Sequence, residues 1–309
     1  MFTAFIAHPD CARHDSGAHH PECPERLSAI QDRLIESGLW PLLRHYEAPL
    51  ATDGELTAVH SAAHLKHILE VAPRAGLHYL DEDTAMSPGT VAAARRAAGA
   101  VRLAVDLVYQ QEARNAFCSV RPPGHHAERD RAMGFCFFNN VAVGVAHALK
   151  QPGIERVAVL DFDVHHGNGT EQIFQHSDQV LFLSTFQYPF YPFTDINFPA
   201  DNIVHGPLPA GSDGAAFREM VERRWLPHLR AFKPQMLFIS AGFDGHKDDI
   251  MAHMGLVEAD YRWITEQACA AADTHAQGRI VSVLEGGYEL PALARSVEAH
   301  LRVLGGFGG

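Results

Sequence analysis

The stretch VAVLDFDVHHGNGTEQIF, residues 157–174, joins an apolar run to a dense group of ionisable side chains. Its first residues are β-branched and apolar, which is typical of a strand buried on both faces of a parallel sheet. Asp161, Asp163, His165 and His166 then follow almost at once. Because charged groups near a buried strand must be paired or bound, the stretch indicates that these side chains hold a ligand.

The composition is that of a globular protein with a substantial core, with 309 residues, 47% of them hydrophobic and 20% charged. We expect a single domain over residues 1–309. The net charge of −12 argues against stable nucleic-acid binding, which needs a basic face. No apolar run approaches the roughly 20 residues of a membrane span, so no membrane partner is expected.

Cysteine and histidine usage indicates the compartment and the chemistry. Five cysteines form no Cys-x-x-Cys pair, and the first residues, MFTAFIAHPD, have no signal-peptide pattern. We therefore expect a cytoplasmic protein without a disulfide framework. Histidine is unusually frequent, with 21 residues and several doublets. Such doublets favour metal binding or proton transfer.

Strand-like and helix-like runs alternate along most of the chain. Near-continuous apolar strands separated by helices predict an α/β fold, with a mostly parallel sheet covered by helices on both faces. Residues 186–214, rich in proline and aromatic residues, predict a long functional loop. The expected strands are residues 2–7, 115–120, 157–162, 179–185, 235–240 and 279–284, and the expected helices are residues 24–37, 90–111, 140–149, 215–231 and 258–276.

The polar motifs of the chain all follow expected strands. RPPGHH (121–126) and AGFDGHKDD (241–249) each come directly after an apolar run. DVHHGNG (163–169) and EGGYEL (285–290) have the same position after two further strands. Since open α/β sheets bind ligands at the carboxyl ends of their strands, these motifs should converge on one crevice.

Asp163 and His165 are two apart in an extended segment, so their side chains point the same way. With Asp244 from another strand end, they offer two carboxylates and one imidazole, which suits a catalytic zinc ion. Iron(II), cobalt or manganese would also fit this ligand set. The alternative is that Asp163 and His165 only cap and turn the chain before a helix beginning near Thr170.

Two further motifs supply groups for proton transfer and charge stabilisation. His125 and His126 follow two prolines that fix the backbone. One imidazole is suited to act as general base for a metal-bound water and the other as its electrostatic partner. Tyr288 follows two glycines at the same sheet edge, where its hydroxyl can donate a hydrogen bond to an oxyanion. A tyrosine that merely packs against the turn is the alternative.

Six motifs, in order along the chain, resemble those of the histone deacetylase/acetylpolyamine amidohydrolase family. They look most like its class II branch and the bacterial relatives of that branch, and the resemblance runs from about residue 8 to about residue 290. It implies the arginase-deacetylase-like α/β sandwich around a mostly parallel eight-stranded sheet. The motifs are HHPECPERL (19–27), RPPGHHA (121–127), GFCFFNNVA (134–142), DFDVHHGNGTE (161–171), SAGFDGHKDD (240–249) and EGGY (285–288).

The resemblance implies roles for individual residues. It implies that the zinc ligands are Asp163, His165 and Asp244. The histidine pair would be His125 and His126, with His126 as general base and acid. Tyr288 would be the oxyanion donor. It also implies a structural potassium ion, held by Asp161, the hydroxyl of Ser184, the carbonyl of Thr185 and the backbone carbonyls of Asp163 and His165. Asp161 would in addition orient the first histidine of the pair, and His166 receives no ligand role.

Substrate-binding residues follow from the same resemblance. Phe135 corresponds to one aromatic wall of an acyl-lysine tunnel, and the proline-rich loop should supply the other wall through Tyr191. Gly286 in the EGGY turn is expected beside the substrate, and Arg26 matches an arginine of an internal channel behind the metal. Met251 is expected at the tunnel rim. Polyamine-selective relatives can have a glutamate there, so a neutral methionine weakens the polyamine interpretation.

Asn168 stands where some members of the family have an aspartate facing the second histidine. An amide stabilises an imidazolium less than a carboxylate does. We therefore expect the acidity of His126 to differ from that in those members.

The sequence thus predicts a zinc-dependent amide hydrolase that removes acetyl or other short acyl groups from acyl-lysine side chains of proteins or peptides. One alternative is an amidohydrolase that acts on acetylated polyamines or other small acylated amines. Another is a catalytically weak acyl-lysine binding protein, which the presence of Tyr288 and all three metal ligands argues against. An oligomer is compatible with either class.

Overall fold

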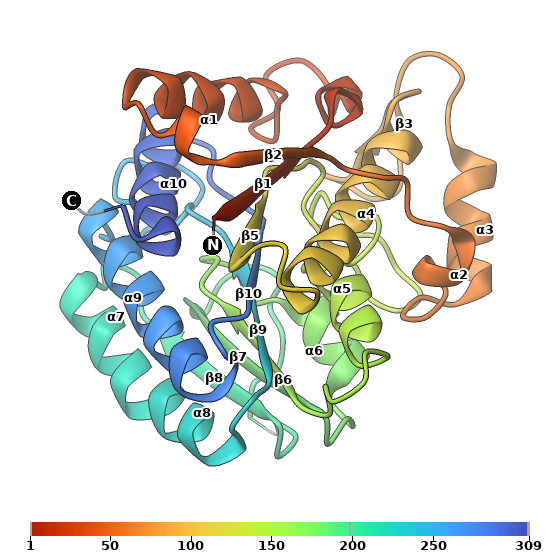
Figure 1. The fold of residues 1–309 in the computed structure, drawn as a ribbon. Coiled ribbons are helices and arrows are strands. Elements are labelled where there is room, and N and C mark those ends of the chain that lie inside the picture. The colour runs from red at the N-terminus through yellow and green to blue at the C-terminus, as the bar shows by residue number, and fades with distance from the viewer. Residues whose placement is uncertain (1, 198, 308–309) are drawn as a thin grey trace.

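The computed structural model describes residues 2–197 and 199–307 and is built around an eight-stranded sheet (Figure 1). The strand order is β2-β1-β5-β10-β9-β6-β7-β8, and the neighbouring pairs are parallel. The predicted parallel sheet is therefore confirmed. The strands are β1 (Thr3–Ala7), β2 (Arg44–Glu47), β5 (Asn115–Cys118), β6 (Val157–Asp161), β7 (Val180–Gln187), β8 (Ile203–Leu208), β9 (Met236–Ala241) and β10 (Ile280–Leu284), with β3 (His78–Tyr79) and β4 (Ala85–Met86) forming a separate antiparallel pair.

The two edge strands of the large sheet, β2 and β8, lack the continuous apolar run from which the other strands were predicted. The prediction of an uninterrupted loop over residues 186–214 is wrong, because β8 pairs along β7 as far as Leu208. Gly206 and Pro207 interrupt its apolar run, and proline is tolerated there because an edge strand leaves one side without a ladder partner. β2, with the sequence RHYE, is polar and largely exposed, so it lacks an apolar signal.

The helices at 25–36, 90–109, 140–148 and 258–275 confirm four predicted helices to within a few residues. The predicted helix 215–231 is also present, as α7 and α8 joined by a π-helical turn, Val221–Trp225. None of the described helices is both long and apolar enough to cross a membrane. The helices are α1 (Glu25–Glu36), α2 (Asp53–Leu56), α3 (Ala62–Val71), α4 (Thr90–Tyr109), α5 (Asn140–Ala148), α6 (Asn168–Phe174), α7 (Gly214–Met220), α8 (Leu226–Phe232), α9 (Glu258–His275) and α10 (Leu290–Gly305).

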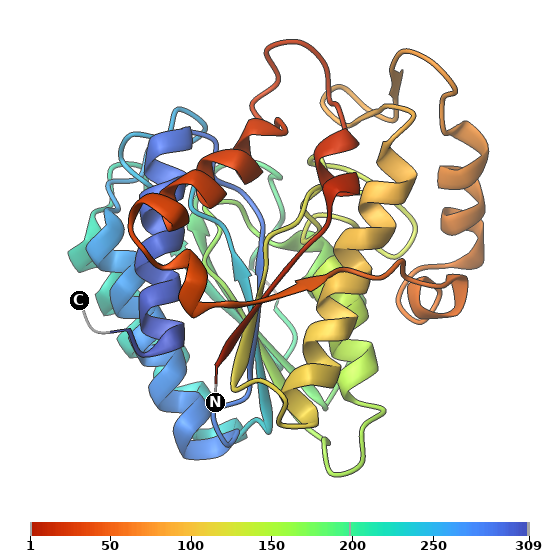
Figure 2. The same cartoon turned by 45° about the horizontal axis from the view of Figure 1, so that its top comes forward.

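Helices cover both faces of the sheet, and each face buries its own apolar cluster (Figure 2). On one face α4 and α5 pack against the strands through residues such as Val101 and Val143. On the other, α1 and α7 to α10 pack through residues such as Leu229 and Val297. With two covered faces, the polar ends of the strands are left as the place for a site.

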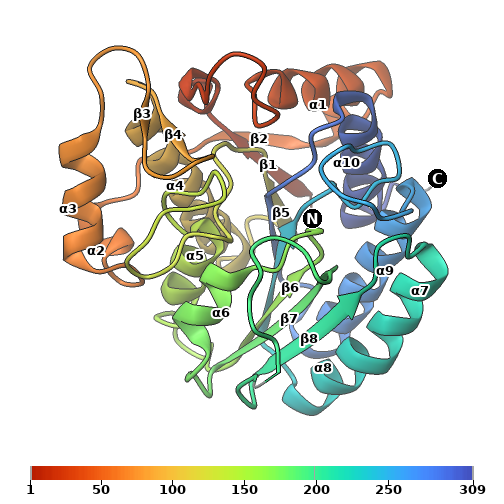
Figure 3. The same ribbon diagram turned by 180° about the vertical axis from the view of Figure 1, so that it is seen from behind.

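The register of the sheet brings distant polar residues together at one edge. Asp161, the last residue of β6, lies opposite Ser184 of β7 and Ser240 of β9. Seen from behind, β6, β7 and β8 run side by side, with α6 next to them (Figure 3). The segments that follow these strands therefore start from neighbouring points, which gives their side chains a common crevice.

Candidate active site

Asp163, His165 and Asp244 converge at the ends of β6 and β9, and all three are buried. Nδ1 of His165 lies 3.1 Å from Asp163 Oδ1 and 3.1 Å from Asp244 Oδ2. Burial lowers the pKa of His165, but its hydrogen bonds with the two carboxylates raise it to about 10. The point between these atoms therefore favours a positive charge, and two carboxylates with one imidazole fit a divalent metal ion.

Glycines allow this close approach of carboxylates and backbone. The N–H of Gly286 donates to Asp163 Oδ2 at 2.8 Å. A Cβ atom at Gly286 would lie 2.1 Å from Asp244 Oδ2, so no larger residue fits without moving the cluster. Gly286 therefore belongs to the wall of the carboxylate cluster and supports Asp163.

The histidine pair lies beside this cluster, with ring centroids 4.0 Å apart. Nδ1 of His125 is 3.0 Å from Asp161 Oδ2, whereas Nδ1 of His126 is 2.8 Å from the amide oxygen of Asn168. Burial lowers the pKa of His125, but Asp163 and Asp161 raise it to about 10. Burial and the neighbouring imidazoles hold the pKa of His126 well below its usual value. The opposite pKa shifts favour a protonated His125 and a neutral His126.

Glu285 was not identified from the sequence, although it begins the EGGY motif. It is fully buried, and its Oε2 accepts hydrogen bonds from the backbone N–H of Gly124 at 2.7 Å and of His125 at 3.1 Å. Burial raises its pKa to about 7. Glu285 therefore joins the turn after β10 to the segment that carries the histidine pair, a role that depends on tertiary contacts.

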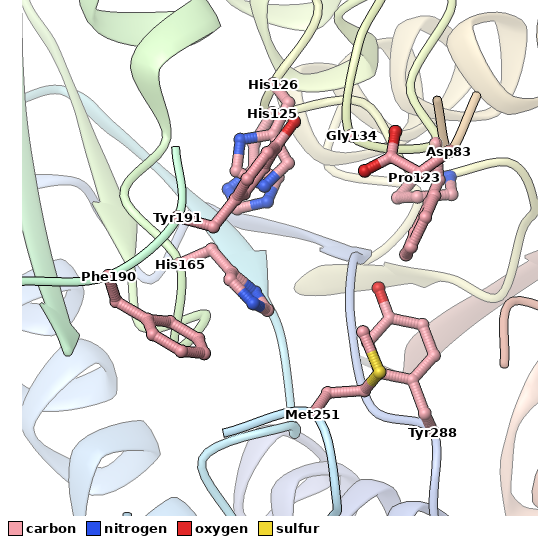
Figure 4. A pocket seen from close by; sticks show the side chains of 11 residues that line it. Asp83, Pro123, His125, His126, Gly134, His165, Phe190, Tyr191, Met251 and Tyr288 are labelled. Atoms are coloured by element: carbon pink, nitrogen blue, oxygen red, sulfur yellow. The ribbon is translucent and has the colours of Figure 1, made fainter. Parts of the chain in front are cut away.

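A cavity of about 190 Å³ opens next to the histidine pair (Figure 4). Tyr288 directs its hydroxyl into this cavity, and the imidazole of His165 also lines it. Burial and the charge of Asp244 raise the pKa of Tyr288 above its usual value, so its hydroxyl stays a donor. The lining consists of Asp83, Pro123, His125, His126, Gly134, Phe135, His165, Phe190, Tyr191, Met251 and Tyr288.

Aromatic rings form much of the cavity wall. Tyr191 stands edge-on to His126, with centroids 5.3 Å apart and an angle of 87° between the rings. Phe190, which the sequence did not single out, stacks on His165 at 5.5 Å and 18°. Phe135 and Met251 also line the cavity. The signal for Phe190 was its position next to Tyr191 in the proline-rich segment.

Arg26 lies behind this wall and not in the lining. Its Nε donates to the carbonyl oxygen of Gly287 at 2.7 Å, and another of its nitrogens donates to the carbonyl oxygen of Glu285. Its guanidinium carbon is 4.9 Å from the ring centroid of Tyr288. Arg26 therefore holds the EGGY turn and the phenol ring in position.

Asp83 is a second lining residue that the sequence did not indicate. It lies in the turn between β3 and β4, and its carboxylate faces the cavity in Figure 4. Burial raises its pKa, and the charge of Asp81 raises it further. The acidic segment LDED, residues 80–83, was the available signal.

Ser184 and Thr185 lie in the second half of β7, where Ser184 is the register partner of Asp161. Both hydroxyls are buried, and among the described residues neither has a hydrogen-bond partner. Buried hydroxyls are normally satisfied, so these oxygens have free acceptor capacity. Together with the Asp161 carboxylate, the free hydroxyl of Ser184 fits a monovalent cation site.

The fold closely matches a solved structure. The crystal structure of the HDA15 HD domain matches with a TM-score of 0.92 and 31% identity, over 99% of this chain and 90% of that one. The chain belongs to the histone deacetylase family, because the protein-family model described as "Histone deacetylase domain" matches its residues 20–304. The resemblance inferred from the motifs is confirmed.

Two curated relatives illustrate the range of this family. A histone deacetylase-like amidohydrolase of Pseudomonas aeruginosa is 37% identical over 310 residues, which cover 93% of this chain and 81% of that protein. The polyamine deacetylase HDAC10 of Homo sapiens is 35% identical over 323 residues, covering 96% of this chain and 47% of that protein. The protein is accordingly a hydrolase of the deacetylase and amidohydrolase class.

Proposed function

We propose that this protein is a zinc-dependent deacylase that removes acetyl or other short acyl groups from acyl-lysine side chains. One observation carries the proposal: a narrow cavity leads to a metal-type ligand cluster that is flanked by a neutral imidazole and a tyrosine hydroxyl. The aromatic wall suits the apolar stem of an acyl-lysine, while the reactive amide reaches the polar base.

Asp163, His165 and Asp244 would hold the divalent ion. Their two carboxylate oxygens and one imidazole nitrogen lie within 4.8 Å of one another, as ligands of one ion must. When bound, such an ion polarises the amide carbonyl and makes a water molecule more acidic.

His126 acts as the general base in this proposal, because its lowered pKa keeps the imidazole unprotonated near neutral pH. Its Nδ1 is fixed by Asn168, which leaves Nε2 to receive a proton from water and later deliver it to the leaving amine. His125, held cationic by Asp161, supplies positive charge beside it. Tyr288 donates a hydrogen bond to the oxygen on which negative charge develops.

We further propose that a potassium ion binds behind this cluster. Asp161, the Ser184 hydroxyl and the backbone carbonyls of Thr185, Asp163 and His165 would be its ligands. The unpartnered hydroxyl of Ser184 supports this assignment. An ion there would stiffen the ends of β6 and β7, from which the divalent-ion ligands start.

A second candidate function is hydrolysis of acetylated polyamines or other small acylated amines. The Asp83 carboxylate at the cavity favours it, because it would attract a cationic substrate. Met251, a neutral residue in the same lining, gives no such attraction. Activity of the zinc-loaded protein on acetylated polyamines alone, with none on acyl-lysine peptides of several chain lengths, would replace the main proposal by this one.

Substitution of the ligands tests metal dependence. Asp163→Ala or Asp244→Ala should lose both the catalytic ion and hydrolysis, because two remaining ligands rarely hold such an ion. Elemental analysis and a peptide deacetylation assay measure the two losses. Undiminished metal content in both variants would show that the ion is held elsewhere.

A further inference from the structure

A second group of ligand-type side chains consists of His166, Glu171 and His205, which we call the His-Glu-His cluster. His166 follows β6, Glu171 lies in α6 and His205 lies in β8. The Nε2 atoms of His166 and His205 are 2.7 Å and 2.6 Å from the same oxygen, Glu171 Oε2. Their side chains are 3%, 14% and 5% exposed in chain order, so little water reaches the cluster.

The segment between β7 and β8 holds both imidazoles at their other ring nitrogen. Nδ1 of His205 is 3.3 Å from the carbonyl oxygen of Ile196, and Nδ1 of His166 is 3.1 Å from Thr194 Oγ1. A carbonyl oxygen only accepts, so Nδ1 of His205 carries a proton. Metal-binding histidines are commonly oriented in this way, with one nitrogen donating to oxygen and the other directed at the ion.

Two imidazole nitrogens face a single carboxylate oxygen at the centre of the cluster. Because Nδ1 of His205 carries its proton, Nε2 of that ring presents a lone pair to Glu171 Oε2. A divalent ion would supply positive charge to all three ligand atoms at once.

The His-Glu-His cluster has the same compactness as the proposed catalytic ligands, since its three ligand atoms also lie within 4.8 Å of one another. Two imidazole nitrogens and one carboxylate oxygen suit zinc or cobalt, whereas calcium and magnesium prefer oxygen ligands. We infer that this cluster binds a second zinc-class divalent ion, independent of the ion proposed for the active site.

Such an ion would fasten one wall of the active-site cavity. Thr194 and Ile196 belong to the segment of residues 188–197 that also carries Phe190 and Tyr191 into the cavity. By fixing the two imidazoles that this segment contacts, the ion would hold the aromatic residues in place without touching a substrate. Glu171 retains some exposure, which leaves a path for a water to complete the coordination.

Metal stoichiometry tests the second site. The full chain is loaded with Zn²⁺, freed of excess ion and measured by elemental analysis; we expect two ions per chain. Glu171→Gln and His205→Asn should each retain one, and Asp244→Ala should also retain one. His228→Asn, which changes an exposed histidine on α8, is the matched control and should retain two.

The outcomes separate this inference from the proposed function. A wild-type protein with one ion, lost in Asp244→Ala and kept in His205→Asn, overturns the second site and leaves the catalytic proposal intact. A wild-type protein with one ion, lost in His205→Asn and kept in Asp244→Ala, would support the second site and overturn the proposed catalytic metal site. The number of ions bound by the wild-type protein can by itself refute the second site. The inference therefore stays testable even if a variant fails to fold.

Two measurements on Asp244→Ala, in which only the second site is expected to remain, give a readout apart from activity. Adding Zn²⁺ should raise its melting temperature, since an ion that binds only the folded state stabilises it. The ion should also slow proteolysis within residues 188–197. If Zn²⁺ changes neither quantity, the cluster is held together by protons and the inference fails.

Discussion

Tyr288→Phe removes one oxygen atom from the candidate active site and keeps the ring that surrounds it. The ring packs edge-on to Phe135, with centroids 5.9 Å apart, and lies under the guanidinium of Arg26. The backbone N–H of Tyr288 donates to Asp249 Oδ2 at 2.6 Å, which anchors the turn independently of the hydroxyl. The substitution therefore isolates the hydrogen bond that the phenol would donate.

We expect kcat for an acetyl-lysine peptide to fall by about 10²–10³, or about 2.7–4 kcal/mol, which is typical for the loss of one oxyanion donor. KM should change little, because the hydroxyl is proposed to strengthen its bond only as negative charge develops. Zinc content and melting temperature should stay near the wild-type values. Steady-state kinetics, elemental analysis and thermal unfolding measure these quantities on the same preparation.

Tyr261→Phe is the matched control, because Tyr261 is a fully buried tyrosine of the hydrophobic core. Its kcat should remain close to that of the wild type. An unchanged kcat in Tyr288→Phe, with zinc still bound, would mean that Tyr288 only packs the EGGY turn and would refute the proposed role.

Three further predictions follow from the same structure. Asn168→Asp should raise the pKa of His126, so the acidic limb of the kcat/KM profile should move to higher pH; an unmoved limb would contradict the assignment of His126 as base. Glu22→Gln should cost about 3–5 kcal/mol in urea unfolding, because it leaves the buried Arg121 without its charge partner. The pKa of Glu22 in the folded protein lies well below its usual value of 4.5, so the stabilisation by its carboxylate is fully present above pH 4.5 and is lost as the pH falls through the folded pKa. The Glu22→Gln variant should not show this loss. Tyr191→Ala should raise KM for acetyl-lysine peptides and weaken selection against bulky acyl groups, and an unaltered acyl preference would contradict it.

The parts of the fold that the sequence predicted are those with strong local patterns. The six central strands and the helices α1, α4, α5 and α9 were found because continuous apolar runs and helical spacing are visible in the chain. β8 was missed because Gly206 and Pro207 break its run. α10 was overlooked although its buried positions, including Leu293, Val297 and Leu301, recur every four residues.

Some residues of the candidate site could be predicted from the sequence and others could not. Groups that follow strands could be placed at one edge from topology alone, and the structure brings Asp163, His165 and Asp244 together there. Glu285 and Asp83 depend on contacts between segments far apart in sequence, which no local pattern reveals. The single-domain organisation, the cytoplasmic location and any oligomer stay predictions.

The side chains that follow β6 turn toward different partners, so one short stretch contributes to several side-chain clusters. Asp161 accepts a hydrogen bond from His125 and lies beside Ser184, whereas Asp163 and His165 turn together toward Asp244. His166, the next residue, turns away toward Glu171. The chain bends at residues 163–165, and His165 and His166 face two different clusters without competing for one ion. On the proposals made above, the first cluster carries the chemistry and the second holds the wall beside it, and a shift of this segment would disturb both.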